Sequence, residues 1–184
     1  MEGKLIILSG PSGVGKDTIF RGLVAHGLNL KKAVTATTRE KRPNEEEGVH
    51  YYFKTTEEFN KLIEDNELLE WTIYNGNFYG TLKKVVEDEL ARGEKVVLVI
   101  DVQGALAIKE QYPDSLLVFI RPPSIEKLIQ RISNRGDECE DDIKWRIERA
   151  EYEMQQMDKY DAVIENDDLD EAVEKLKKEI KNAI

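Results

Sequence analysis

Residues 8–18 read LSGPSGVGKDT, and this stretch decides the fold. It follows the branched apolar run LIIL at residues 5–8 and precedes a segment with apolar residues at helical spacing. Gly10, Gly15 and Lys16 match the spacing of a GxxxxGK phosphate loop. A buried strand that runs into a glycine loop and then into a helix directs backbone N–H groups and the positive helix end at an anion. The stretch therefore predicts an α/β fold with a phosphate site in which Lys16 contacts the outer phosphates.

One residue departs from the loop pattern, because Asp17 stands where a serine or threonine hydroxyl is expected. An acid in the first turn of a helix is favourable to the helix dipole by itself. Beside a bound triphosphate it would repel unless it pointed outward or met a metal ion. We expect Asp17 to point outward or to reach a metal through water, and direct metal contact stays an open alternative. Thr18 offers a hydroxyl one residue later.

The size and charge of the chain limit its class. Its 184 residues suit one domain, and its formal net charge of −10 argues against binding to nucleic acid or to an anionic membrane. The single cysteine, Cys139, cannot form an internal disulfide, and one cysteine with two histidines argues against a zinc site. The first apolar run is too short for a signal peptide or a membrane span. We expect a cytoplasmic monomer or homodimer.

Short apolar runs rich in branched residues recur along the chain, and each is followed by a helix-like segment. They lie at residues 5–8, 96–100 and 116–120, with weaker candidates for the same sheet at 33–37 and 162–165. Parallel strands that are buried on both faces have this composition, so we predict a parallel core sheet in a layered α/β fold. The first helix is expected to begin near Lys16, to end at Gly27 and to bury Ile19, Phe20, Leu23 and Val24.

The sequence between the apolar runs at residues 33–37 and 96–100 has a different pattern. HYYF at residues 50–53 reads as a strand, and Thr55 with Glu58 forms a capping box for a helix. Asn75-Gly76 separates LLEWTIY from NFYG and is a strong hairpin signal. We predict an antiparallel insertion here, and a helical stretch later at residues 124–157.

A second basic cluster lies in TATTREKR, where Arg39 and Arg42 are close together in an acidic chain. With Tyr51 and Tyr79, these arginines offer forked donors and phenolic hydroxyls for a second phosphate. The alternative is a solvated charged loop.

Taken together, these stretches resemble the guanylate kinase family, which are nucleoside monophosphate kinases of the P-loop class. The matching blocks, in order, are GPSGVGK, TTREKRP, GVHYYF, LLEW, NGNFYGT, IDVQGA, RPPSIEKLIQRISNRG and VIENDDLDEA. The resemblance implies a three-layer P-loop kinase fold and one domain, residues 1–184, with a GMP-binding insertion at about 38–82 and a helical lid at about 124–157. It implies transfer of the γ-phosphoryl group of Mg·ATP to GMP, and to dGMP, giving ADP and GDP.

The resemblance also assigns site residues. It implies ATP binding by Gly10, Ser12, Gly13, Val14, Gly15, Lys16, Asp17, Thr18 and Asn166. It implies catalysis, as charge neutralisation during transfer, by Lys16, Arg131, Arg135 and Arg146. It implies GMP binding by Thr35, Arg39, Arg42, Tyr51, Glu70, Tyr79, Thr81 and Asp101. No ligand of Mg²⁺ is assigned firmly, and the candidates, through water, are Thr18, Asp17 and Asp101.

Glu70 is the residue expected to recognise guanine. Guanine presents N1–H and an exocyclic amino group on one edge, and one carboxylate can accept from both, whereas adenine lacks this pair of donors. A buried acid of this kind can reject the wrong base by as much as ~10⁴-fold, because polar groups would be left unpaired. Val99 departs from the family, which usually has an acid there, and Arg149 is expected to be surface charge paired with nearby acids.

Two other functions remain open from the sequence. The GKD tripeptide at residues 15–17 resembles some small kinases that act on a phosphorylated sugar. A catalytically inactive module could bind phosphorylated peptides through Arg39, Arg42 and Tyr51. Glu70 and the paired arginines favour a nucleotide, and the intact phosphate loop favours an active kinase.

Overall fold

The computed structural model describes residues 3–133 and 140–183, without the side chains of 140–143. Arg135, one of the predicted catalytic residues, lies outside the described residues. The chain divides into two compact units. We call Leu5–Leu30 with Val97–Ile184 the core unit, and Lys31–Val96 with the residues up to Lys4 the insertion unit.

A five-stranded sheet has the order β2-β7-β1-β8-β9. Its strands are β1 (Lys4–Ser9), β2 (Lys31–Lys32), β7 (Lys95–Val99), β8 (Leu116–Arg121) and β9 (Ala162–Glu165). Strands β8 and β9 and most of β1 and β7 belong to the core unit, whereas the short β2 belongs to the insertion unit. β1 pairs in parallel with β8, and β8 in parallel with β9. The predicted strands at 5–8, 96–100, 116–120 and 162–165 are thereby confirmed within about one residue.

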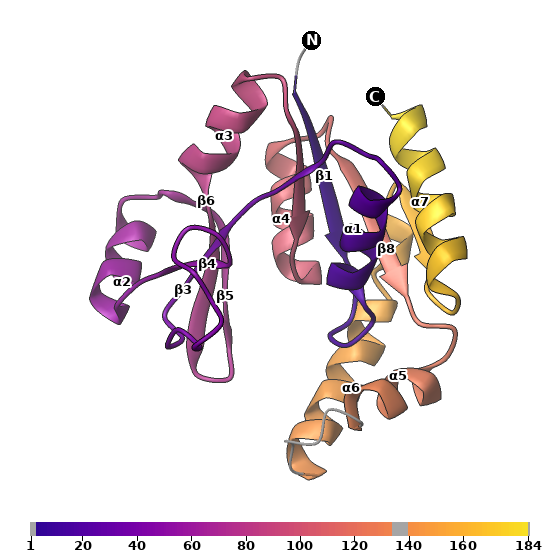
Figure 1. The fold of residues 1–184 in the computed structure, drawn as a ribbon. Helices are drawn as coiled ribbons and strands as arrows, with labels where there is room; N and C mark the ends of the chain where they lie inside the picture. The colour runs from indigo at the N-terminus through magenta and orange to yellow at the C-terminus, as the bar shows by residue number, and fades with distance from the viewer. Residues whose placement is uncertain (1–2, 134–139, 184) are drawn as a thin grey trace. The chain divides into compact units, whose positions relative to one another are not determined.

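Apolar side chains of this sheet alternate between two buried faces. Ile6 and Leu8 pack in one cluster with residues of α1 (Lys16–Ala25) and α7 (Leu169–Asn182), which lie together over that face (Figure 1). Ile7 is equally buried but lies outside this cluster, on the face where Figure 1 shows α4 (Val102–Gln111). Burial on both faces explains why these strands read as continuous apolar runs, and it confirms the layered α/β fold.

The burial of the apolar side chains of α1 agrees with the sequence prediction except at one position. Ile19 and Leu23 are fully buried and Phe20 is half-buried, as predicted. The predicted burial of Val24 is wrong, because its side chain is 45% exposed. Apolar spacing marks the buried face of a helix, but it does not show where a neighbouring element stops covering it.

The remaining helices of the core unit include those of the predicted helical stretch. They are α5 (Ile125–Ser133), α6 (Glu140–Met154) and a short 3₁₀ turn at Met157–Lys159. The last helix, α7, begins after Asp168, whose carboxylate accepts a hydrogen bond from the Glu171 amide.

The insertion unit contains a four-stranded sheet with the order β4-β3-β6-β5. Its strands are β3 (Thr35–Thr37), β4 (Tyr51–Phe53), β5 (Leu68–Tyr74) and β6 (Asn77–Leu82). The assignment of residues 33–37 to the core sheet is therefore wrong, since only Lys31–Lys32 pair there and the chain then leaves for the second sheet. The insertion is antiparallel at β3–β6 and β5–β6, but β3 and β4 pair in parallel.

The predicted hairpin and capped helix of the insertion are confirmed. Asn75 and Gly76 both have positive φ, 48° and 73°, which is the backbone of a type I′ turn. Helix α2 (Thr56–Glu64) begins with the capping box of Thr55 and Glu58 and buries Phe59 against one face of the small sheet. Helix α3 (Lys83–Ala91) follows β6 directly.

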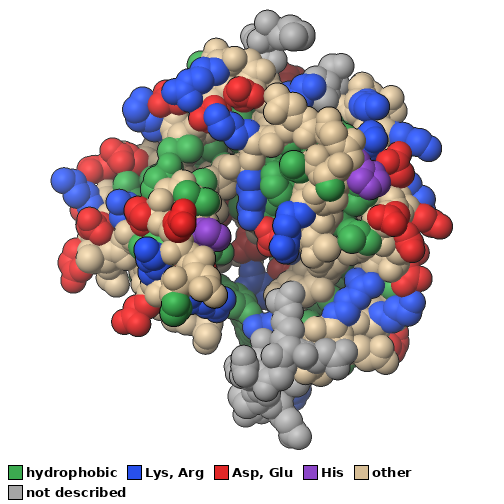
Figure 2. Space-filling view, viewed as in Figure 1, with side chains coloured by type: hydrophobic (Ala, Val, Ile, Leu, Met, Phe, Trp, Pro, Cys, Tyr) green, Lys and Arg blue, Asp and Glu red, His purple; other side chains and the backbone are tan. Residues whose placement is uncertain are grey.

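Charge is distributed over the surface in both signs. On the face drawn in Figure 2, lysine and arginine side chains are interspersed with aspartate and glutamate side chains. No helix within residues 3–133 and 140–183 is long and apolar enough to cross a membrane.

Candidate active site

The phosphate loop joins β1 to α1 in the core unit. Gly10, Gly13 and Gly15 all have positive φ, of 138°, 85° and 96°. At Gly10 an added Cβ would lie 2.1 Å from the Ile120 carbonyl oxygen, so the loop passes too close to β8 for any side chain. The residue before α1 is Gly15, which has no side chain to cap the helix, in contrast to the capping residues before α2, α4 and α7, so the start of α1 suits an anion.

Lys16 folds back over the loop from the first turn of α1. Its Nζ donates to the carbonyl oxygens of Gly10, at 2.6 Å, and Pro11, at 3.0 Å. Loss of water around the ammonium lowers the pKa of Lys16 to about 8, although the carboxylates of Glu153, Asp17 and Asp101 act in the opposite direction. The lysine is therefore close to losing its charge in the free protein, and phosphate oxygens would restore the preference for the charged form.

Asn166 packs against the loop from the end of β9. Its Nδ2 donates to the Val14 carbonyl oxygen at 2.8 Å, and an added Cβ on Gly15 would lie 2.7 Å from the same nitrogen. The main-chain carbonyl oxygen of Asn166 accepts a hydrogen bond from Arg131 Nη2 at 2.9 Å. Asn166 and Arg131 thus lie next to the phosphate loop, and contact of Asn166 with the adenine stays a prediction.

Asp17 and Thr18 are both exposed in the first turn of α1. Mg²⁺ prefers oxygen ligands and commonly keeps several waters beside one or two carboxylates and substrate phosphates. The donor set at the start of α1, a carboxylate followed by a hydroxyl, fits this preference. Within the described part of the chain there is no cluster of three His, Cys, Asp or Glu side chains that could hold a metal ion.

Asp101, at the end of the β7 segment, belongs to a charged cluster of the core unit. Its Oδ1 caps α4 by accepting from the Gly104 amide at 2.8 Å, and its Oδ2 lies 3.1 Å from Arg149 Nη2. Arg149 Nε donates to Glu153 Oε1 at 2.9 Å. Arg149 pairs with acids, as expected, but the expectation that it is surface charge is wrong, because its side chain is only 25% exposed and one of its partners is 48 residues away.

Glu153 is a buried carboxylate, with 5% of the residue exposed. Burial raises its pKa, and Arg149 and Lys16 act in the opposite direction. Two cations and two carboxylates, Lys16, Arg149, Asp101 and Glu153, therefore balance one another beside the phosphate loop. Arg146 is half-buried on the same helix, α6.

In the insertion unit, the strand registers align several of the predicted GMP-binding residues in one row across the sheet. Residues directly opposite in neighbouring strands point to the same face of a sheet. The register aligns Tyr51 with Thr35, Thr35 with Thr81, and Thr81 with Glu70. Tyr79 lies two residues before Thr81 on β6 and therefore points to the same face. The opposite face is apolar and packs on Phe59 of α2.

Glu70 is held at the end of this row. Its Oε1 accepts a hydrogen bond from the Thr81 hydroxyl at 2.6 Å, and only 9% of the glutamate is exposed. A carboxylate has two oxygens and about four lone-pair positions, so it can accept from Thr81 and also from a ligand with adjacent N–H groups. This is the donor pattern that guanine presents.

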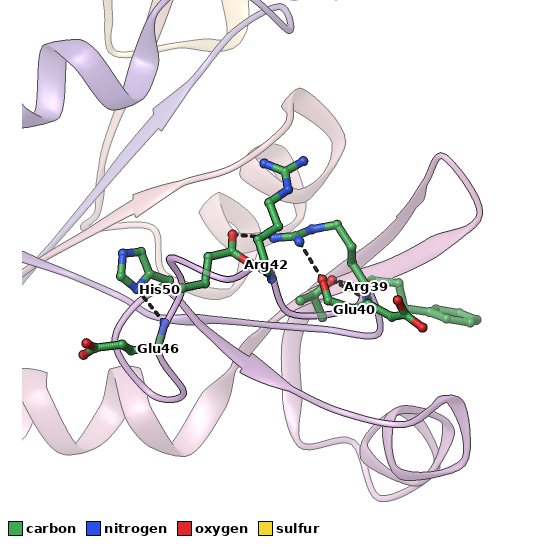
Figure 3. A network of polar contacts seen from close by, with 8 residues as sticks. Arg39, Glu40, Arg42, Glu46 and His50 are labelled. Carbon is green, nitrogen blue, oxygen red and sulfur yellow. Dashed lines mark hydrogen bonds and ion pairs between the residues drawn. The ribbon is translucent and has the colours of Figure 1, made fainter. Parts of the chain in front are cut away.

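Arg39 and Arg42 lie in the loop after β3, within the polar network drawn in Figure 3. Arg39 is half-buried, pairs with Glu45 through Nη2 at 2.6 Å, and lies 5.4 Å from the centre of the Tyr51 ring. The bond to Glu45 raises the pKa of Arg39, so this arginine stays charged. Arg42 is exposed. The Tyr51 and Tyr79 rings meet at a steep angle, with 6.2 Å between ring centres.

A model of the guanylate kinase family matches residues 2–183, nearly the full length of the chain. The chain belongs to the guanylate kinase family. A guanylate kinase of Desulfitobacterium hafniense is 45% identical over 176 residues, which are 96% of this chain and 88% of that protein. A guanylate kinase of Carboxydothermus hydrogenoformans is 47% identical over 95% of this chain and 86% of its own length.

Among solved structures, the crystal structure of guanylate kinase from Anaplasma phagocytophilum superimposes with a TM-score of 0.77 at 33% identity. The match covers 98% of this chain and 86% of that one. Sequence and fold therefore both place the chain among guanylate kinases, and the resemblance inferred from its motifs is confirmed.

For three residues of this guanylate kinase family member, only the structure shows a position next to predicted site residues. They are Glu45, Arg149 and Glu153. Arg149 and Glu153 are four residues apart on one helix, which is a signal for an ion pair, but their burial and the link to Asp101 depend on the fold. Glu45 follows Arg42 by three residues in a run of three acids, and the sequence does not distinguish it from Glu46 and Glu47.

Proposed function

We propose that this protein transfers the γ-phosphoryl group of ATP to GMP, giving ADP and GDP. The observation that carries the proposal is the buried Glu70 carboxylate, bonded to Thr81 and facing the same side of the small sheet as Tyr51 and Tyr79. One face of the sheet thus offers a carboxylate that can accept hydrogen bonds from guanine and hydroxyl groups that can donate hydrogen bonds to a phosphate. Membership of the guanylate kinase family supports the same reaction.

On the ATP side, the amides of the phosphate loop and Lys16 would bind the phosphates. The glycines at 10, 13 and 15 let the backbone approach them closely, and the uncapped start of α1 adds its N–H groups. Asn166 would hold the loop in shape through Val14. When bound, Mg²⁺ would neutralise charge on the phosphates and orient them, with Asp17 and Thr18 as the nearest candidate ligands, directly or through water.

On the acceptor side, Arg39, Arg42, Tyr51 and Tyr79 would hold the phosphate of GMP. Glu70, Thr35 and Thr81 would hold the base. Asp101 was predicted to contact the base too, and it belongs to the core unit, where it caps α4 and pairs with Arg149. Its contact with guanine is proposed on the family resemblance alone.

Catalysis would consist of alignment and charge neutralisation. Phosphoryl transfer has a loose transition state in which charge spreads over the equatorial oxygens, so the protein supplies fixed positive groups and a dry, aligned arrangement. Lys16, Arg131, Arg135 and Arg146 would neutralise this charge. A positioned arginine can contribute ~10³ to 10⁵ in rate in reactions of this class.

The domain organisation is part of the proposal. Residues 38–82 would be the GMP-binding insertion and residues 124–157 the lid. In support, the four-stranded sheet forms within the insertion unit, and Arg131 of α5 lies next to the phosphate loop through Asn166.

Release of ADP tests the proposal. The purified protein is incubated with Mg·ATP and, in turn, GMP, dGMP, AMP, CMP, UMP and ribose bisphosphate. We expect strong turnover with GMP and dGMP only. Turnover with the sugar phosphate alone would favour the kinase suggested by the GKD tripeptide. No turnover, with binding of a phosphopeptide instead, would favour the inactive module.

A further inference from the structure

Glu45 lies between the two arginines of the predicted acceptor-phosphate site. Its Oε1 accepts from Arg39 Nη2 at 2.6 Å, and its Oε2 accepts from the backbone N–H of Arg42 at 2.9 Å. One carboxylate therefore connects the side chain of one arginine to the main chain of the other. Both bonds lower the pKa of Glu45, so the group is a carboxylate at neutral pH.

The carboxylate is held by its own turn. The Glu45 amide donates to the Arg42 carbonyl oxygen at 3.0 Å, while the Arg42 amide donates to the Glu45 carboxylate, so two bonds close the turn in both directions. The Glu45 side chain is only 13% exposed. Because one oxygen is fixed on the backbone, the other oxygen is presented to Arg39 at a fixed position.

Arg39 retains donors for a ligand in this arrangement. Its Nη1 donates to the Glu40 carbonyl oxygen at 2.7 Å and its Nη2 to Glu45. A guanidinium has five N–H donors, so a group that makes these two bonds can also donate to a phosphate. The guanidinium carbon also lies 5.4 Å from the centre of the Tyr51 ring, a further contact that favours this position of the group. Glu45 can therefore orient Arg39 without occupying all of its N–H donors.

We propose that Glu45 is a positioning residue for the acceptor phosphate. It remains bonded to Arg39 and to the Arg42 backbone when the nucleotide binds, and it sets the two arginines so that both donate to one phosphate monoester. This inference rests on the proposed function. The opposite role is a placeholder, in which the carboxylate occupies the phosphate position and must leave, and the test separates the two.

The test compares E45Q with the wild type in binding GMP and guanosine, measured by calorimetry. A glutamine keeps one oxygen for the Arg42 amide but turns an N–H₂ group toward Arg39, donor against donor. We expect the Kd for GMP to rise about tenfold, the effect of one lost charge-assisted hydrogen bond, and the Kd for guanosine to stay the same. The KM for ATP should not change. E46Q, which makes the same change of charge in the same loop, should bind GMP as the wild type does.

Other results would overturn the inference. Equal or tighter binding of GMP by E45Q would identify a placeholder, and an equal loss for guanosine and GMP would show a merely structural role. In an R39A background, E45Q should add little further loss, and a fully additive loss would contradict action through Arg39. If the wild type itself neither bound nor phosphorylated GMP, the proposed function would fail before the variant was compared.

Discussion

Arg149 Nη2 lies 3.1 Å from Asp101 Oδ2, although 48 residues separate the two in the chain. The pair joins α6 to the residue that caps α4, and the same guanidinium also bonds to the buried Glu153. A charge removed from such a cluster leaves its partners in a poorly solvated place.

R149A should therefore destabilise the protein by about 2 kcal/mol, because Asp101 and Glu153 lose their shared cation. Urea unfolding followed by circular dichroism measures the change. R92A is the matched control: Arg92 pairs with Glu89 on the surface and its side chain is 63% exposed, so we expect a cost below about 0.5 kcal/mol. Equal costs for the two variants would contradict the importance of burial.

E70Q should lower kcat/KM for GMP by about 10- to 100-fold, since a neutral amide replaces the carboxylate that we propose accepts from guanine. Discrimination between GMP and IMP, which lacks the exocyclic amino group, should shrink in the variant. Steady-state kinetics with both nucleotides measures it. Unchanged discrimination would show that Glu70 does not contact the base.

The lowered pKa of Lys16 predicts a pH effect on ATP. The free protein needs a charged lysine to bind phosphates, and this lysine has a pKa of about 8, below its ordinary value, so the charged form is lost as the pH rises past about 8. We expect kcat/KM for ATP to fall tenfold per pH unit above that point. With ATP saturating, bound phosphates favour the charged lysine, and kcat/KM for GMP should not show this fall at about pH 8. A flat ATP profile would rule out this titration.

G15A should weaken ATP binding strongly, because Gly15 has positive φ and an added Cβ would meet Asn166 Nδ2 at 2.7 Å. G27A is the matched control, since Gly27 has a similar φ of 81° but nothing within 4 Å of the added carbon. Both variants should lose about 1 kcal/mol of stability from backbone strain. Only G15A should raise the KM for ATP, and an equal rise in G27A would attribute the effect to strain alone.

The features that the sequence predicted correctly are local ones. The Asn75-Gly76 turn needs only two residues with positive φ, and the Thr55–Glu58 box needs only one helical turn. The buried strands were readable because both faces are covered, which makes every position apolar. The family resemblance supplied the rest of the candidate site, including Glu70.

The failures depend on where distant segments meet. Residues 33–37 have a strand composition, but composition does not say which of two sheets a strand joins, and the chain crosses from one to the other after Lys32. The burial of Val24 and the pairing of Arg149 with Asp101 likewise follow from neighbours that are far away in the sequence. Glu45 is one of three consecutive acids in the sequence, and only the folded turn, in which it accepts a hydrogen bond from the Arg42 amide, distinguishes it from the other two.

The two-residue turn between β5 and β6 has a consequence for base selectivity. It sets the register that pairs Glu70 with Thr81, and side chains alternate between faces along each strand. A shift of β6 by a single residue would move Thr81 and Tyr79 together to the apolar side, where α2 packs, and would part them from Glu70 and Tyr51 on the other strands. If the proposed site is right, the length of an exposed turn thus sets the base selectivity of the sheet, although neither Asn75 nor Gly76 belongs to the proposed site itself.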